Sequence, residues 1–287
     1  MDVWRFEAIG TVWEIETARP LTAGEREAIG ETVEDFDHIW SRFRDDSLVT
    51  ALAAEPQEVP TPPDAVAMLD LYRALSDATG GAVQPLVGDS LVARGYDAGY
   101  SLQDHGTRPA PRDWTELLAW DDGALELFAP ALVDVGAIGK GRLVDVVHDL
   151  LGALGHVEHL VDAGGDLRRR GGPVRVGLEH PFDATRAIGV AVVTDAALCG
   201  SAANRRAWPG LHGGLHHVLD ARTGEPVRAI AATWAIAGEA MLADAAATAL
   251  FFDGGAEFAA QFGVEWVRMT TAGVVEWSAG SRMEVFA

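Results

Sequence analysis

The sequence predicts an α+β fold, and three features of its pattern support that class. Predicted strands and helices alternate irregularly, several strands are joined as antiparallel hairpins, and no internal repeat or long linker interrupts the chain. A regular doubly wound sheet would require strands and helices in steady alternation. The chain has 287 residues, 48% of them hydrophobic and 23% charged, which is enough to build a large core. We therefore expect a single domain spanning residues 1–287.

The N-terminal half begins with an extended segment in which apolar and charged residues alternate around a Gly10-Thr11 break. In the first predicted helix, Thr22 and Glu25 have the spacing of a capping box. A later hairpin turns at Asp121-Asp122-Gly123. In chain order, the predicted elements are an extended segment over 3–16, helices over 22–43 and 65–79 with a proline-rich connector over 56–63, a polar loop over 103–112 and a hairpin over 114–128.

The C-terminal half begins with a short apolar strand that leads into a glycine-rich turn and a helix. Short strands bounded by glycine or turn residues follow, and an alanine-rich helix precedes the last of them. In chain order, we predict a strand over 132–135, a helix over 139–154, strands over 159–162, 174–178, 188–193, 217–219 and 229–236, a helix over 238–252, and short strands within 264–285.

The composition excludes several classes of protein. The formal charge is −21 and the sequence pI is about 4.6. Nucleic acids and anionic membranes are bound by basic patches, so we expect neither as a partner. One cysteine, Cys199, allows no disulfide framework and no cysteine-built zinc site within the chain. The first residues do not have the pattern of a signal peptide, and no apolar run could span a bilayer. We therefore expect a cytoplasmic protein without membrane insertion.

Lys140 is the only lysine, and it lies between two glycines in the segment 134–141, where a strand opens into a helix. Glycines allow a phosphate to approach the backbone, and a helix N-terminus attracts negative charge. The segment has neither the P-loop nor the dinucleotide-binding glycine pattern. A phosphate site and a tight turn without a ligand both remain open here, as does chance placement of the single lysine.

Two further segments carry groups that could act in catalysis. Asp244 and Thr248 are four residues apart on a predicted helix, so they share one face and could provide oxygen ligands for Mg²⁺. The alternative is an exposed aspartate and a threonine bonded to its own helix. His217 could be a general base, a structural histidine or part of a metal cluster with His212 and His216. The glycine pair between His212 and His216 makes a metal cluster the weaker interpretation.

Two other segments are less informative. Residues 162–166 contain a strand end followed by a double glycine, which could line a ligand or form a turn. Cys199-Gly200-Ser201 lacks the Gly-x-Ser-x-Gly pattern, so a serine hydrolase is not expected.

Seven blocks, taken together and in order, resemble the FAD:protein FMN transferase family, often called ApbE-like. The blocks lie at residues 9–11, 41–47, 80–85, 134–145, 164–166, 217–226 and 241–250, and they include Asp134-x-Gly-Ala-Ile-Gly-Lys-Gly and His217-x-x-Asp-x-Arg-Thr-Gly-x-Pro. The resemblance implies a T-fold-like arrangement of mixed sheets packed with helices.

The resemblance also implies an activity and a set of site residues. Proteins of this family bind FAD and Mg²⁺, transfer FMN to a threonine or serine hydroxyl of a target protein, and release AMP. The implied Mg²⁺ ligands are Asp244, Thr248 and the carbonyl of Ala137, and the implied catalytic base is His217. The implied FAD contacts are Ile9, Phe43, Ala82, Val83, Gln84, Asp134, Lys140 and Leu219.

Two alternatives use the same site. In a Mg²⁺-dependent FAD pyrophosphatase, water would be the nucleophile, and a non-catalytic protein would only bind FAD. In each case the chain must compensate the charge of a pyrophosphate, and we expect Mg²⁺ and Lys140 to supply positive charge. Gln84 departs from the family, which usually has an acidic residue there. Residues 199–201 also differ, so no role is assigned to them.

Overall fold

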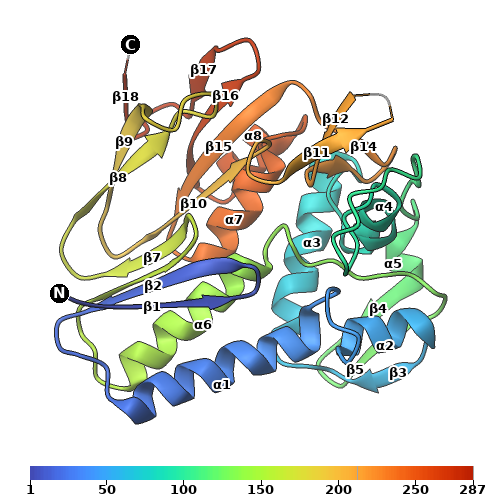
Figure 1. Cartoon of the computed structure of the whole chain (residues 1–287), viewed down its shortest axis with the longest axis horizontal. Helices are drawn as coiled ribbons and strands as arrows, with labels where there is room; N and C mark the ends of the chain where they lie inside the picture. Colours follow the sequence, from blue (N-terminus) through green and yellow to red (C-terminus); the bar gives the residue numbers. More distant parts are fainter. Residues whose placement is uncertain (212, 287) are drawn as a thin grey trace.

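The largest element of the computed structural model is an eight-stranded antiparallel sheet (Figure 1), and the structure describes residues 1–211 and 213–286. The order of its strands is β1-β2-β6-β7-β10-β15-β16-β17, so neighbours in the sheet such as β2 and β6 are separated by a long excursion of the chain. The strands are β1 (Asp2–Ala8), β2 (Thr11–Thr17), β6 (His159–Ala163), β7 (Asp166–Arg170), β10 (Ala197–Ala202), β15 (Ile230–Ala237), β16 (Glu265–Thr270) and β17 (Val275–Trp277).

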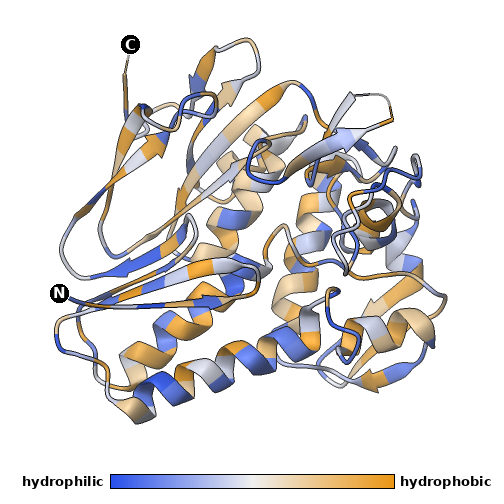
Figure 2. Ribbon diagram, viewed as in Figure 1, coloured by the Kyte–Doolittle hydropathy of each residue, from blue (hydrophilic) through white to orange (hydrophobic). Residues whose placement is uncertain are grey.

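One face of this sheet is covered by three helices, α1 (Ala23–Trp40), α6 (Gly139–Ala153) and α7 (Ala240–Ala249). Thr22 and Glu25 form the predicted capping box at the start of α1. Hydrophilic and hydrophobic segments alternate along α1, whereas α7 is mostly apolar (Figure 2). This difference follows from position, because α7 packs against α6, β10 and β15 and is buried on nearly every side.

The opposite face of the sheet packs against a small three-stranded sheet. Its strands are β8 (Val174–Glu179), β9 (Ala187–Val193) and β18 (Glu284–Val285). Alternation along a strand divides the residues between the two cores. Leu198 packs toward the small sheet, whereas its neighbours Ala197 and Cys199 belong to the helical core. The central strands are therefore buried on both faces.

The remaining helices and short strands lie outside these two sheets. α3 (Ala65–Thr79) packs against α7 and α8 and ends at Gly80, which is in the left-handed conformation. Short elements gather beside it (Figure 1). They are α2 (Leu48–Ala54), β3 (Glu58–Pro60), η1 (Pro85–Val87), α4 (Gly88–Ala93), α5 (Trp114–Leu117), β4 (Leu118–Trp120), β5 (Ala124–Leu127), β11 (Ala207–Gly210), β12 (Gly213–His216), β13 (Leu219–Asp220), β14 (Glu225–Pro226) and α8 (Gly255–Gln261).

The predicted α+β class is confirmed, as are the four main helices and the hairpin that turns at residues 121–123. Two strand predictions are wrong. Residues 132–135 form no strand, because Leu132 accepts a hydrogen bond from Gly88 and Asp134 donates one to Pro85, so neither pairs in a ladder. Of the strand predicted over 217–219, only Leu219 lies in a strand.

No helix within residues 1–211 and 213–286 is both long enough and apolar enough to cross a membrane. The cytoplasmic location stays a prediction.

Candidate active site

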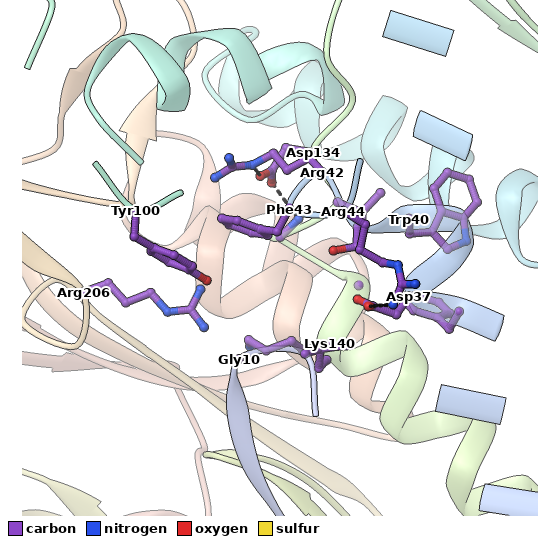
Figure 3. A pocket seen from close by; sticks show the side chains of 16 residues that line it. Gly10, Asp37, Trp40, Arg42, Phe43, Arg44, Tyr100, Asp134, Lys140 and Arg206 are labelled. Carbon is purple, nitrogen blue, oxygen red and sulfur yellow. Dashed lines mark hydrogen bonds and ion pairs between the residues drawn. The ribbon is translucent and has the colours of Figure 1, made fainter. Parts of the chain in front are cut away.

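Two adjoining cavities lie where the large sheet meets the smaller elements. The larger has a volume of about 420 Å³ and the smaller about 290 Å³. Both are lined by the β1–β2 turn, by the segment that precedes α6 and by side chains of the intervening loops. The residues common to both are Gly10, Phe43, Asp134, Gly136, Lys140 and Arg206. The two cavities therefore form one cleft, and Figure 3 shows its smaller part.

The structure brings the sequence-predicted site residues together in this cleft. Asp244 is the exception, because it lies just behind the wall with 1% of its surface exposed. The predicted residues that line the cleft are Ile9, Phe43, Ala82, Val83, Gln84, Asp134, Ala137, Lys140, His217, Leu219 and Thr248. They come from segments more than 200 residues apart in the chain.

The close packing of α6 and α7 places three oxygen groups that could coordinate a cation near one another: the carboxylate of Asp244, the hydroxyl of Thr248 and the carbonyl of Ala137. The backbone N–H of Gly141 donates to Oδ2 of Asp244 at 3.0 Å. The hydroxyl of Thr248 lies 3.5 Å from the carbonyl oxygen of Ala137. Behind them, the buried carboxylate of Asp145 accepts from the first backbone N–H groups of α7, at 2.8 Å each. The N-terminus of α7 is therefore capped by Asp145 of α6, which holds in place the helix that carries Asp244 and Thr248.

Lys140 is already engaged by carboxylates. Its ammonium pairs with Asp166 and lies 4.0 Å from Oδ2 of Asp244. Burial lowers the pKa of Lys140, but these two carboxylates more than offset that effect and hold the pKa above its ordinary value. Burial, reinforced by Asp166, raises the pKa of Asp244 to about 7, although Lys140 opposes the shift.

The charge around Lys140 is not balanced. Two buried carboxylates, Asp166 and Asp244, face one ammonium, and Oδ1 of Asp166 is buried without a hydrogen-bond partner in the described part of the chain. A divalent cation beside Asp244 would compensate this negative charge, and carboxylate, hydroxyl and carbonyl oxygens are the donors that Mg²⁺ prefers. The residues present therefore fit a Mg²⁺ ion.

Asp134 is held from three directions. Its carboxylate accepts from Nε of Arg42 at 2.5 Å and from the backbone N–H of Gly136 at 2.7 Å, while the hydroxyl of Tyr72 donates to its carbonyl oxygen at 3.0 Å. The Arg42 guanidinium lies 4.2 Å from the ring centre of Phe43 and 4.9 Å from that of Tyr96. Asp134 and Arg42 thus form a mostly buried ion pair beside the rings of Phe43 and Tyr96.

Gln84 uses its polar atoms within the protein. Its Nε2 donates to the carbonyl oxygen of Pro111 at 2.7 Å, and its Oε1 accepts from the N–H of Leu86 at 3.0 Å. The side chain is 3% exposed. An ionised carboxylate at this position could accept from Leu86 but could not donate to Pro111, whereas the amide does both.

His217 lies between β12 and β13 and lines the larger cavity. Burial, together with the positive charge of Arg206 and the neighbouring His216, lowers its pKa to about 3. Its Nδ1 is buried and has no partner among the residues described. His216 is separate, because its Nε2 donates to the carbonyl oxygen of Val227. His212 lies outside the described residues, and no group of three or more metal-binding side chains occurs within residues 1–211 and 213–286.

Sequence reasoning missed several residues of the cleft. Arg42 lies in residues 41–47, one of the seven segments that resemble the family, and could have been predicted from that segment. Tyr72, Tyr100 and Arg206 carried no signal, because each comes from a segment without a motif.

The fold belongs to the class seen in crystal structures of ApbE proteins. The ApbE protein of Thermotoga maritima aligns with a TM-score of 0.82 and 23% identity over 96% of each chain. Flavin transferase ApbE of Vibrio cholerae aligns with a TM-score of 0.78 and 22% identity, covering 98% of this chain and 97% of that one. Flavinyl transferase ApbE of Pseudomonas stutzeri aligns with a TM-score of 0.79 and 22% identity over 96% of this chain and 94% of its own. At these identities the likeness is one of fold.

The chain belongs to the ApbE family, whose model matches residues 9–267. Two relatives carry the name FAD:protein FMN transferase. The one from Rhodobacter capsulatus is 28% identical over 294 residues, covering 94% of this chain and 55% of the relative. The one from Treponema pallidum is 29% identical over 280 residues, covering 85% and 76%. The chain thus spans about half the length of the first relative and three quarters of the second.

Proposed function

We propose that this chain is a Mg²⁺-dependent FAD:protein FMN transferase that acts on a threonine or serine hydroxyl of a target protein. Membership of the ApbE family and the names of the two relatives support the activity. The observation that carries the proposal is the grouping of Asp244, Thr248, Ala137 and His217 around one cleft of suitable size. Cavities of about 300–1,000 Å³ are the usual size for small-molecule and cofactor sites.

Asp244, Thr248 and the carbonyl of Ala137 would hold Mg²⁺. When bound there, the ion would supply positive charge to the diphosphate oxygens as the P–O–P bond breaks. The chain itself contributes the position of these oxygens, because Gly141 fixes one side of the Asp244 carboxylate and Asp145 fixes the start of α7.

His217 would accept the proton of the acceptor hydroxyl. The hydroxyl oxygen would then form a bond to the phosphorus on the FMN side, and the bond from that phosphorus to the AMP oxygen would break, so that AMP leaves with the electron pair. The lowered pKa of His217 keeps its ring neutral at pH 7, so a lone pair is available. A bound diphosphate would offset the nearby positive charges and make the ring more basic.

The experiment that tests the proposal measures AMP release and flavin attachment together. The purified protein is incubated with FAD and a peptide-tagged threonine acceptor, with Mg²⁺ or with EDTA, and the gel is read for flavin fluorescence. Asp244→Asn should lower Mg²⁺-dependent AMP release at least about a hundredfold, since it removes a charged ligand. The matched control is Asp122→Asn, because Asp122 is exposed on the β4–β5 turn. Full turnover by Asp244→Asn would contradict the metal assignment.

The same assay separates the alternatives. AMP together with a fluorescent acceptor supports the transferase. AMP release that no acceptor protein changes would indicate a pyrophosphatase. Bound flavin without any AMP would indicate a binding protein and would overturn the catalytic proposal.

A further inference from the structure

The positive charges that line the cleft are not equally free. Lys140 is paired with Asp166, and Arg42 is paired with Asp134. Arg206 also lines both parts of the cleft, but it forms no ion pair with any residue that the structure describes. In a chain of net charge −21, an unpaired cation inside a cavity is unusual and needs an explanation.

The Arg206 guanidinium is held in place by a neutral group. Its Nη1 donates to the hydroxyl of Tyr96, and its Cζ lies 5.8 Å from the centre of the Tyr96 ring. Figure 3 shows Arg206 and Tyr100 together on one side of the cleft, facing Gly10 and Lys140. A side chain added at Gly10 would come within 3.9 Å of Nη2 of Arg206, so the guanidinium reaches the β1–β2 turn across the cleft.

We propose that Arg206 binds the diphosphate of FAD, an inference that rests on the function proposed above. The Lys140 charge is opposed by two carboxylates, so it cannot by itself compensate an incoming dianion. The planar Arg206 guanidinium has N–H groups that donate to no carboxylate in the described part of the chain. A guanidinium matches phosphate oxygens in geometry and charge. The Tyr96 hydroxyl orients the guanidinium without neutralising its charge.

The test is equilibrium binding in EDTA, so that binding is measured without turnover. Affinities for FAD, FMN and riboflavin are determined from flavin fluorescence for the native chain and for Arg206→Gln and Arg206→Lys. We expect Arg206→Gln to weaken FAD about ten- to a hundredfold, which is typical for the loss of a hydrogen bond to a charged group. Riboflavin, which has no phosphate, should bind with unchanged affinity. Arg206→Lys keeps the charge but loses the planar guanidinium, so its FAD affinity should be intermediate.

Arg175→Gln is the matched control. It removes the same charge from an exposed position on β8, in the sheet on the far side of the core, and should bind FAD as the native chain does. Unchanged FAD affinity in Arg206→Gln would overturn the inference while leaving the proposed function intact. An equal loss for riboflavin would also overturn it, because Arg206 would then contact the flavin ring. A native chain that binds no FAD either in EDTA or with Mg²⁺ present would overturn both proposals.

Discussion

At the scale of single residues, Gln84 shows how a buried amide ties two segments together. Its donor holds the carbonyl of Pro111 in the long loop, and its acceptor holds the N–H of Leu86 at the start of η1. A carboxylate at the same place would have two acceptor oxygens and no donor at neutral pH. It would face the Pro111 oxygen in an almost fully buried site.

We therefore expect Gln84→Glu to lower the free energy of unfolding by about 1–3 kcal/mol at pH 7, the typical cost of an unsatisfied buried polar group. The loss should shrink below pH 5, because a protonated carboxyl can again donate to Pro111. Chemical denaturation at both pH values measures the change. Gln103→Glu, which makes the same substitution at an exposed residue, serves as the control. Equal stability of Gln84→Glu and the native chain at pH 7 would contradict the role of this amide.

The identity of many site residues could be predicted from the sequence, but their charge partners could not. Lys140 stood out because it is the only lysine and lies between glycines. Its pairing with Asp166 depends on how the start of α6 meets β7, and nothing local to residue 140 encodes that contact. Arg206 carried no motif at all, and its significance appears only once the other cations are seen to be paired.

At the scale of elements, the contact between α6 and α7 depends on a glycine. A Cβ at Gly141 would lie 2.3 Å from the carbonyl oxygen of Ala240 and 2.8 Å from the Cβ of Asp244. Both distances are well inside van der Waals contact, and one of them is to backbone. The two helices must therefore separate to accept any side chain at position 141, and the hydrogen bond from Gly141 to Asp244 would be distorted.

Gly141→Ala is expected to destabilise the protein by about 1–3 kcal/mol through overpacking. Gly30→Ala is the matched control, because Gly30 is exposed in α1 and a Cβ added there would have no neighbouring atom within 4 Å. It should be neutral or stabilising by about 0.5–1 kcal/mol, since alanine favours the helix. Thermal unfolding of the two variants gives the comparison. A stable Gly141→Ala variant would show that the helices can move apart at little cost.

Periodicity predicted the helices well because each has an apolar face that a local pattern records. It failed for residues 132–135, which have the composition of a buried strand. Two of their backbone groups instead bond to Pro85 and Gly88, which lie more than forty residues earlier in the chain. A short apolar segment can be buried in either way, so its own residues cannot decide between a strand and an irregular segment.

At the scale of the whole molecule, the fold class follows from the mixture of hairpins and helices, but the strand order does not. β2 pairs with β6 across an excursion of more than 140 residues, and β7 pairs with β10 rather than with β8. These pairings are set by packing on both faces of the sheet. The same packing buries polar groups far from the cleft, and one such pair links overall stability to pH.

His148 on α6 and His159 on β6 form this pair beneath the sheet. The Nδ1–H of His159 donates to the carbonyl of His156 at 2.9 Å, so its Nε2 is free to accept from Nδ1 of His148 at 3.1 Å. Burial, with the positive charge of Arg168 and the neighbouring His159, lowers the pKa of His148 to about 3. The folded state therefore keeps His148 neutral over a range in which the unfolded chain protonates it.

The direction of the pH effect follows from this shift. Below about pH 6.5, the ordinary pKa of histidine, the unfolded chain binds a proton at residue 148 that the folded protein does not. This one group should therefore remove about 1.4 kcal/mol of stability per pH unit as the pH falls from about 6.5 toward 3.

The variant His148→Gln tests this effect, because glutamine cannot titrate. The difference in unfolding free energy between this variant and the native chain should shrink by about 2 kcal/mol between pH 7.5 and pH 5. Urea denaturation at both pH values measures the difference, and a constant urea dependence of the unfolding free energy would show that the unfolded state is unchanged. A stability difference that stays the same at the two pH values would mean that His148 is protonated in the folded protein as readily as in the unfolded chain.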